Sequence, residues 1–112
     1  MKTVSTATQA QVLARFFRVL GDPTRLALIR ELEDGERTVG QLVAAVAQPQ
    51  PRVSTHLACL RHCGFAIAER RGKEVVYRLV LGLKDLLGEA DRRAEPLTER
   101  LSSCSRIGPD WM

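Results

Sequence analysis

The sequence predicts a mostly α-helical domain in which four helices are followed by a β-hairpin and a last helix. Apolar residues recur every three or four positions in five segments of the 112-residue chain, as they do on one face of an amphipathic helix. Two short apolar, β-branched runs flank Arg71-Gly72-Lys73, which is typical of a tight hairpin. A chain of this length is expected to form one domain, 1–112, with an ordered core over about 9–101.

The first three helices carry recognisable start and stop signals. The apolar stripe predicts a first helix over 9–20, ended by a glycine. Asp22-Pro23 starts the second helix, because Asp is a good N-cap and Pro suits the first helical position; this helix reaches about Asp34. Thr38 and Gln41 form a capping-box pattern at the start of a short third helix.

The fourth helix and the hairpin follow directly. The helix is expected over about 51–63, where Gly64 ends it. Strands are expected at 65–70 and 74–79. A short turn joins the third and fourth helices, so this pair is interpreted as a helix-turn-helix and the hairpin as its wing.

The last helix is expected over about 81–101. Pro96 lies inside it, and proline removes a helical hydrogen bond, so a kink or break is expected near Glu95. The remaining residues, 102–112, show no periodicity and form a predicted C-terminal tail that carries Cys104.

Positive charge is concentrated on the helix-turn-helix and the hairpin. Residues 50–80 hold six Lys or Arg against two Glu, which equals the net charge of +4 of the whole chain. On a helical wheel the fourth helix turns a small, polar face away from its apolar stripe, as recognition helices do. We therefore expect double-stranded DNA as the partner. The candidate contacts are Gln50, Arg52, Ser54, Thr55 and Arg61 on the helix, with Arg70, Arg71 and Lys73 on the hairpin.

The three cysteines form a second candidate site. Cys59 and Cys63 are four residues apart, so on a helix their Cβ atoms lie about 5–6 Å apart on one face. This separation suits two thiolates on one metal ion better than a disulfide. With Cys104 as a third ligand, the set would favour soft ions: Cd(II) or Pb(II), with Hg(II) or As(III) as alternatives.

Other interpretations of the cysteines remain open at this stage. Buried cysteines commonly pack as small hydrophobes. Arg61 and His62 would support a low-pKa thiolate, so the chain is alternatively a repressor that senses thiol oxidation. An enzyme using Cys59 and His56 as nucleophile and base is disfavoured, because no oxyanion donors or orienting acid are evident.

The N-terminal residues do not resemble a signal peptide. No run approaches the ~18 apolar residues of a membrane span. We expect a cytoplasmic protein without membrane contact, in a compartment where thiols stay reduced.

Three motifs resemble the ArsR/SmtB family of metalloregulatory repressors over about residues 10–95. They are LGDPTRL at 20–26, STHL at 54–57, and the hairpin from 70 to 79 with its glycine turn. The resemblance implies a homodimer formed through the first and last helices, and repression that metal binding relieves. It also implies that Cys104 of one chain approaches the cysteine pair of the other.

The cysteine pattern is similar to that of the CmtR type of cadmium and lead sensors in this family. Cys59, Cys63 and Cys104 are assigned as ligands on that resemblance. The arsenic-sensing branch carries a Cys-x-Cys where this chain has Thr38 and Gly40. The zinc and nickel branches use histidines and carboxylates on the last helix, and this chain has only two histidines, both outside it. Both differences argue against Zn(II), Ni(II) and Co(II).

Overall fold

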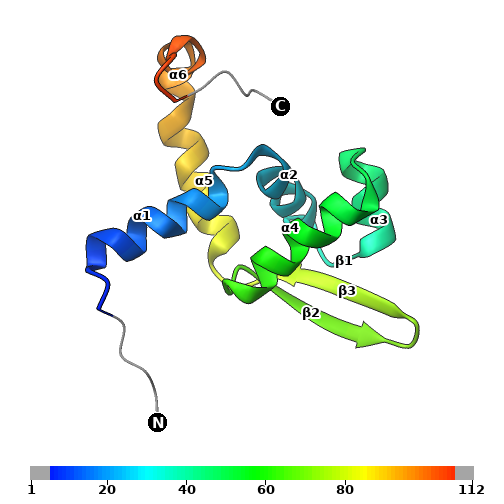
Figure 1. The fold of residues 1–112 in the computed structure, drawn as a ribbon. Helices are drawn as coiled ribbons and strands as arrows, with labels where there is room; N and C mark the ends of the chain where they lie inside the picture. The colour runs from blue at the N-terminus through cyan, green and yellow to red at the C-terminus, as the bar shows by residue number, and fades with distance from the viewer. Residues whose placement is uncertain (1–5, 108–112) are drawn as a thin grey trace.

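The computed structural model describes residues 6–107 and confirms the predicted order of helices and hairpin (Figure 1). The structure differs from the prediction in having a two-residue strand before the third helix and in dividing the last helix into two helices joined by a 3-10 turn. The elements are α1 (Gln9–Leu20), α2 (Pro23–Leu32), β1 (Arg37–Thr38), α3 (Val39–Val46), α4 (Gln50–His62), β2 (Ala66–Arg71), β3 (Glu74–Leu79), α5 (Leu83–Ala94), the 3-10 turn η1 (Glu95–Leu97) and α6 (Thr98–Ser103).

The helix starts predicted from capping residues are confirmed. The Asp22 carboxylate accepts a hydrogen bond of 3.0 Å from the backbone N–H of Arg25 at the start of α2. Thr38 and Gln41 form a reciprocal capping box at α3, with bonds of 3.2 and 2.8 Å. These side chains satisfy backbone N–H groups that have no partner within the helix.

The sheet has three strands in the order β1-β3-β2, all antiparallel. The hairpin closes at the Arg71–Glu74 pair, and Gly72 has a φ of 64° in the turn, as the sequence predicted. Strand β2 starts one residue later than predicted. Strand β1 was not predicted, because two residues are too short to show alternation; it pairs Arg37 with Tyr77.

The core lies between α2, α3, α4, the sheet and the start of α5. The apolar stripe of α4 consists of Val53, Leu57 and Leu60, and all three are completely buried. Leu28 and Ile29 of α2 and Leu42 of α3 are equally inaccessible. The fully buried set is Leu28, Ile29, Leu42, Val53, Leu57 and Leu60. This packing fixes the orientation of α4. The side of the helix that carries the two cysteines and the side that carries the polar residues therefore both remain accessible.

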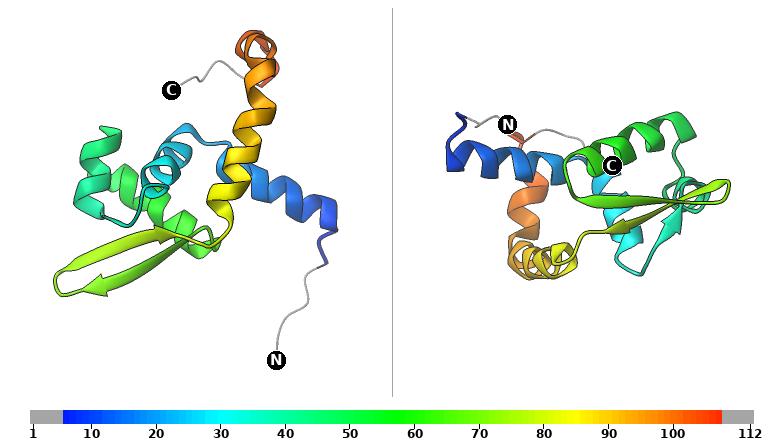
Figure 2. Two further views of the ribbon diagram at one scale, coloured as in Figure 1. Left: turned by 180° about the vertical axis from the view of Figure 1, so that it is seen from behind. Right: turned by 90° about the horizontal axis from the view of Figure 1, so that it is seen from below.

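Helix α1 and the α5–α6 segment project from this body, on the side away from the hairpin (Figure 2). The radius of gyration is 15.6 Å, against about 13 Å for a compact chain of this length. The predicted break in the last helix occurs at η1, where Pro96 lies. The projecting helices expose large apolar side chains: Val12, Leu13, Phe17, Leu86, Leu97 and Leu101.

Two ends of the predicted last helix differ from expectation. Helix α5 begins at Leu83, because Gly82 before it has a φ of 91° and is not helical. Helix α6 continues to Ser103, so Cys104 directly follows a helix. The end of the predicted tail, 108–112, lies outside the described residues. None of the helices within 6–107 combines the length and apolar character needed to cross a membrane.

Candidate functional site

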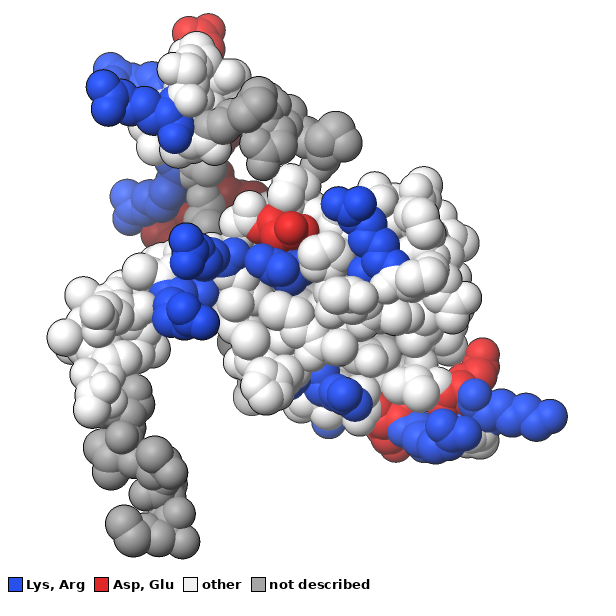
Figure 3. All heavy atoms as spheres, in the orientation of Figure 1, with Lys and Arg blue, Asp and Glu red and all other residues white. Residues whose placement is uncertain are grey.

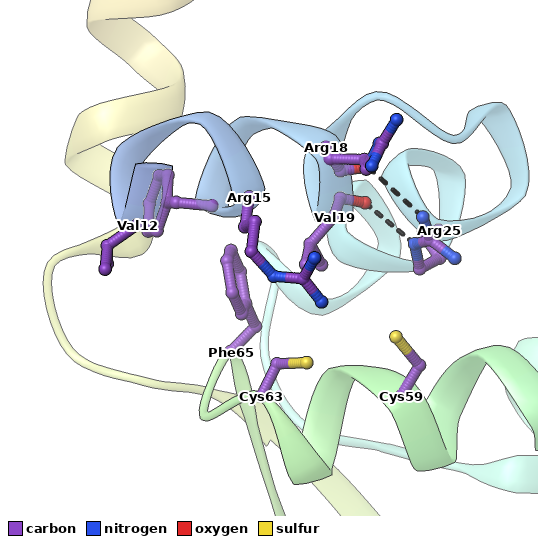
Figure 4. Close-up of a pocket in the computed structure, with 9 residues that line it drawn as sticks. Val12, Arg15, Arg18, Val19, Arg25, Cys59, Cys63 and Phe65 are labelled. Atoms are coloured by element: carbon purple, nitrogen blue, oxygen red, sulfur yellow. Dashed lines mark hydrogen bonds between the residues drawn. The ribbon is translucent and has the colours of Figure 1, made fainter. Parts of the chain in front are cut away.

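A cleft of about 360 Å³ lies between α1 and the C-terminal half of α4, and both cysteines of α4 line it. Figure 4 shows the two sulfur atoms on the same side of α4, pointing toward α1. Cys59 is half-buried and Cys63 is exposed. The structure therefore places these two thiols on one face of α4, as their spacing predicted, and this face lies beside the buried stripe of the helix.

Electrostatics around Cys63 are set by the cleft rather than by neighbours in sequence. Desolvation raises the pKa of the Cys63 thiol, and the adjacent Cys59 raises it further. Arg25 and Arg15 act in the opposite direction without reversing the shift. The expectation that Arg61 and His62 would support a low-pKa thiolate is wrong for Cys63, because its pKa is raised and the two cations that act on it, Arg25 and Arg15, come from α2 and α1.

Arg25 joins three helices around the cleft. Its Nε donates to the carbonyl of Val19 at 2.8 Å, and its Nη2 donates to the carbonyl of Arg18 at 3.2 Å, near the end of α1. Its Nη1 lies 3.5 Å from Nδ1 of His56 on α4. Because α1 ends with carbonyl groups that have no helical partner, a guanidinium is well matched to this position.

His56 belongs to this framework. Its Nε2 is 3.9 Å from a carboxylate oxygen of Asp22. Burial acts to raise the pKa of Asp22, but the Arg25 backbone hydrogen bond and the charges of His56 and Arg25 outweigh it, so this pKa is lowered. These contacts give His56 a structural role in holding α4 against α2.

A soft metal ion fits the two thiols but needs a further donor. Within residues 6–107 of one chain, no group of three His, Cys, Asp or Glu side chains is placed to hold a metal. Cys104 follows α6, at the far end of the projecting segment in Figure 1, and does not line the cleft. One chain therefore contributes two of the three predicted sulfur ligands to a common site.

The opposite side of α4 and the hairpin form the candidate DNA surface. All eight predicted contacts are exposed. Gln50, Ser54 and Lys73 line a common groove of about 310 Å³ between the starts of α3 and α4 and the hairpin. Figure 3 shows basic side chains at the hairpin tip, and a second basic group where α1 meets α4.

Arg71 differs from the other basic candidates, because it is already paired. It binds both carboxylate oxygens of Glu36 and one of Glu69. The hydrogen bonds to Glu36, and then those to Glu69, raise the pKa of Arg71 above its ordinary value. Arg71 therefore ties the wing to the segment before β1, and less of its charge is available to a phosphate.

Sequence reasoning assigned no role to Arg15, Arg18 or Arg25, which all line the thiol cleft. Arg25 lies within the LGDPTRL motif, and this motif was the only signal for it. Helical periodicity shows that α1 is amphipathic, but it does not show which face of α4 this helix covers.

Comparison with known proteins identifies the family. Residues 22–68 match the family described as "Bacterial regulatory protein, arsR family". The chain is 42% identical over 101 residues to the probable mercury resistance operon repressor of Streptomyces lividans. The aligned region covers 89% of this chain and 81% of that protein. It is 45% identical over 67 residues to the HTH-type transcriptional regulator CmtR of Mycobacterium bovis. This aligned region covers 60% of this chain and 57% of CmtR.

A solved structure supports the fold independently. The homodimeric winged helix-turn-helix DNA-binding domain of Mb0332 from Mycobacterium bovis has a TM-score of 0.70, with 22% identity, over 91% of this chain and 97% of that one. The fold is therefore a winged helix-turn-helix. The family match over residues 22–68 and the long match to the Streptomyces repressor together show that the chain belongs to the ArsR family of bacterial regulatory proteins, which are DNA-binding transcriptional regulators and not enzymes.

Proposed function

We propose that the protein is a cytoplasmic, homodimeric repressor that releases its operator DNA when a thiophilic metal ion binds Cys59, Cys63 and Cys104 of the partner subunit. The observation that carries this proposal is the position of two thiols on the recognition helix itself. They lie on one side of α4, and the polar residues proposed to face DNA lie on another. A ligand at the thiols therefore acts on α4 without contacting DNA.

The projecting helices support the dimer. Val12, Leu13 and Phe17 of α1 are about half exposed, and Leu97 and Leu101 near the C-terminus are exposed as well. Exposed large apolar side chains grouped on projecting helices are typical of an interaction site in soluble proteins. We propose that α1 and the α5–α6 segment form the interface, which also brings Cys104 to the partner's cleft.

For DNA, we propose that α4 enters the major groove and that the hairpin contacts the flanking backbone. Gln50, Ser54 and Lys73 form the centre of this surface, since they line one groove. Thr55 donates its hydroxyl to the carbonyl of Pro51 at 2.9 Å, so toward DNA this hydroxyl acts as an acceptor. Arg52, Arg61 and Arg70 supply phosphate contacts, and Arg71 contributes more weakly because of its carboxylate partners.

Cd(II) and Pb(II) are the proposed effectors, because three thiolates favour soft divalent ions. Hg(II) is a second candidate, and one observation favours it: the Streptomyces relative, which matches along 89% of this chain, is described as a mercury resistance repressor. As(III) also accepts three thiolates. We propose that ion binding draws α4 toward α1 and tilts it, which changes the separation of the two recognition helices in the dimer.

Thiol oxidation is the alternative signal. A sensor thiol needs a low pKa and access to the oxidant. Cys63 is exposed, but its pKa is raised rather than lowered. Metal binding fits this environment better, because the ion itself displaces the thiol protons. Loss of DNA binding on peroxide treatment without metal, reversed by a reductant, would favour the alternative.

The test is an anaerobic titration of the reduced protein with Cd(II), Pb(II) and Hg(II). Ultraviolet thiolate-to-metal absorption reports binding, and fluorescence anisotropy of a duplex selected from a random library by the metal-free protein reports DNA release. Cys59→Ser, Cys63→Ser and Cys104→Ser are each expected to weaken the absorption band and prevent release. Ser103→Ala, beside Cys104, is the matched control and should behave as wild type. A band that is indifferent to all three cysteine substitutions would refute the proposal.

A further inference from the structure

The hairpin carries one arginine whose charge is already matched within the protein. Nη1 and Nη2 of Arg71 donate to the two carboxylate oxygens of Glu36, at 2.5 and 3.1 Å. Nη2 also donates to the carboxylate of Glu69 at 3.0 Å. Glu36 lies in the turn between α2 and β1, so the contact joins the hairpin to the body of the domain. The hydrogen bonds from Arg71 lower the pKa of Glu36, and this carboxylate is therefore ionised at neutral pH.

The neighbouring charges on the hairpin are not held in this way. Arg70 and Lys73 are exposed, and no hydrogen bond or ion pair is found for either side chain within residues 6–107. Glu74 is exposed as well, lines the groove that Lys73 lines, and has no cation bound to it in the same part of the chain. Arg71 thus differs from both neighbouring cations, because a carboxylate already occupies its guanidinium.

A phosphate of DNA and a carboxylate compete for the same groups on an arginine. Two parallel N–H groups of the guanidinium fit either anion in a bidentate pair. In Arg71, the two Nη atoms that would form this pair both donate to Glu36. A phosphate can take the bidentate position only if Glu36 leaves it. Ionised Glu36 also repels the phosphates directly, since charges of like sign raise the energy of the complex.

We propose that Glu36 limits the affinity of the protein for DNA by holding Arg71 off the phosphate backbone. Glu36 acts through Arg71 and is therefore a positioning residue. Its effect falls on the salt-sensitive part of binding, which is the same for any duplex because phosphates carry no sequence information. The inference rests on the proposed contact of the hairpin with DNA, and it involves neither the cysteines nor a metal ion.

This restraint would serve a repressor that must be released. The coupling between an effector and a second ligand is typically worth about a 5- to 150-fold change in affinity. A smaller electrostatic contribution to DNA binding brings release within that range. An arginine held in reserve by a carboxylate keeps this contribution small, while Arg70 and Lys73 still attract the duplex.

The test measures binding of metal-free, full-length protein to a random-sequence duplex by fluorescence anisotropy at several salt concentrations. Glu36→Gln keeps the size of the side chain and one acceptor oxygen but removes the charge. It should bind about three- to tenfold more tightly than wild type, because an exposed ion pair is worth at most about fivefold in each chain of a dimer. The slope of log K against log salt concentration should steepen by about 0.9 for each Arg71 that gains a phosphate.

Two further variants separate the release of Arg71 from the simple loss of a negative charge. Glu74→Gln is the matched control, because it removes the same charge from the same hairpin without freeing a cation. Its slope should equal that of wild type. In the double variant Glu36→Gln/Arg71→Gln, the steeper slope should disappear, because the arginine that would gain a phosphate is absent. The gain of Glu36→Gln should be equal on the random duplex and on one selected by the protein.

Four results would overturn the inference. Weaker DNA binding by Glu36→Gln would mean that Glu36 supports the hairpin in its DNA-binding position instead of restraining Arg71. A steeper slope that persists in the double variant would mean that Arg71 is not the cation concerned. An equal steepening in Glu74→Gln would mean that loss of negative charge is sufficient. A gain confined to the selected duplex would mean that Arg71 reads bases.

Lys73→Ala distinguishes failure of this inference from failure of the proposed DNA contact. A slope for Lys73→Ala equal to that of wild type would refute the contact of the hairpin with DNA and this inference with it. A shallower slope for Lys73→Ala, together with no change in Glu36→Gln, would refute this inference alone and leave the hairpin as a DNA-binding element.

Discussion

Arg25→Ala is expected to lower the free energy of unfolding by about 2 kcal/mol. The side chain makes two charge-assisted hydrogen bonds to α1, at 2.8 Å to Val19 and 3.2 Å to Arg18. Bonds to charged groups contribute about 1.5–3 kcal/mol each, and a cation at a helix C-terminus adds about 0.3–1 kcal/mol. Arg25 is only half-buried, so the lower end of these ranges applies and solvent screening reduces the sum.

The assay is urea unfolding followed by circular dichroism at one fixed protein concentration, because the stability of a dimer depends on concentration. A loss of about 2 kcal/mol corresponds to a fall of about 8–16 °C in Tm for a domain of this size. Arg15→Ala is the matched control. It removes another arginine of the same cleft, one for which no hydrogen bond is found within the described residues, and should change stability by less than about 0.5 kcal/mol.

Arg25→Lys separates charge from geometry. Lysine keeps the positive charge near the end of α1 but lacks the planar fork that reaches two carbonyls and His56 together. Its stability should therefore lie between those of wild type and Arg25→Ala. If Arg25→Ala were as stable as Arg15→Ala, the two hydrogen bonds would contribute nothing measurable, and the account of how α1 is held over the cleft would be refuted.

Three further predictions follow from the structure. Asp22→Ala should lower the free energy of unfolding by about 1 kcal/mol at pH 7, because the N-cap of α2 is lost. Since the pKa of Asp22 is lowered, the stability advantage of wild type over Asp22→Asn should persist above about pH 4 and shrink below it. Urea unfolding at pH 7 and at pH 3 would test this. Phe17→Glu places a charge on the exposed apolar surface of α1 and should yield monomers in sedimentation velocity, whereas Arg61→Glu on α4 should weaken DNA binding and leave the dimer intact. Lys73→Ala should reduce the slope of log K against log salt concentration for DNA binding by about 1. Arg71→Ala should reduce this slope by less, because Arg71 is already paired with carboxylates. Equal slopes for the two variants would contradict this prediction.

Much of the fold follows from signals that act within a few residues. The capping box of Thr38 and Gln41 starts α3, Gly72 closes the hairpin, and Pro96 interrupts the last helix. Each depends on backbone groups next to it in sequence, so the sequence alone predicted it. The stripe of α4 was equally predictable, because a period of 3.6 residues places its members on one side.

Some elements of the structure lack a local signal. Strand β1 exists because Arg37 and Thr38 find open backbone groups on β3, some forty residues further along the chain. The pairing of Arg71 with Glu36 depends on the same approach. Neither could be predicted from residue type or spacing. A two-residue strand is too short to show a period, and the sequence does not indicate which carboxylate an exposed arginine will pair with.

The sequence determined that Cys59 and Cys63 share one face of a recognition helix, because four residues are about one helical turn. Only the tertiary structure decided what lies opposite them. It placed α1 and Arg25 across the cleft, so that Arg15 and Arg25, rather than Arg61 and His62, act on Cys63. The reason is physical: which helix covers a given face depends on the packing of side chains far apart in sequence, and helical periodicity carries no information about that partner.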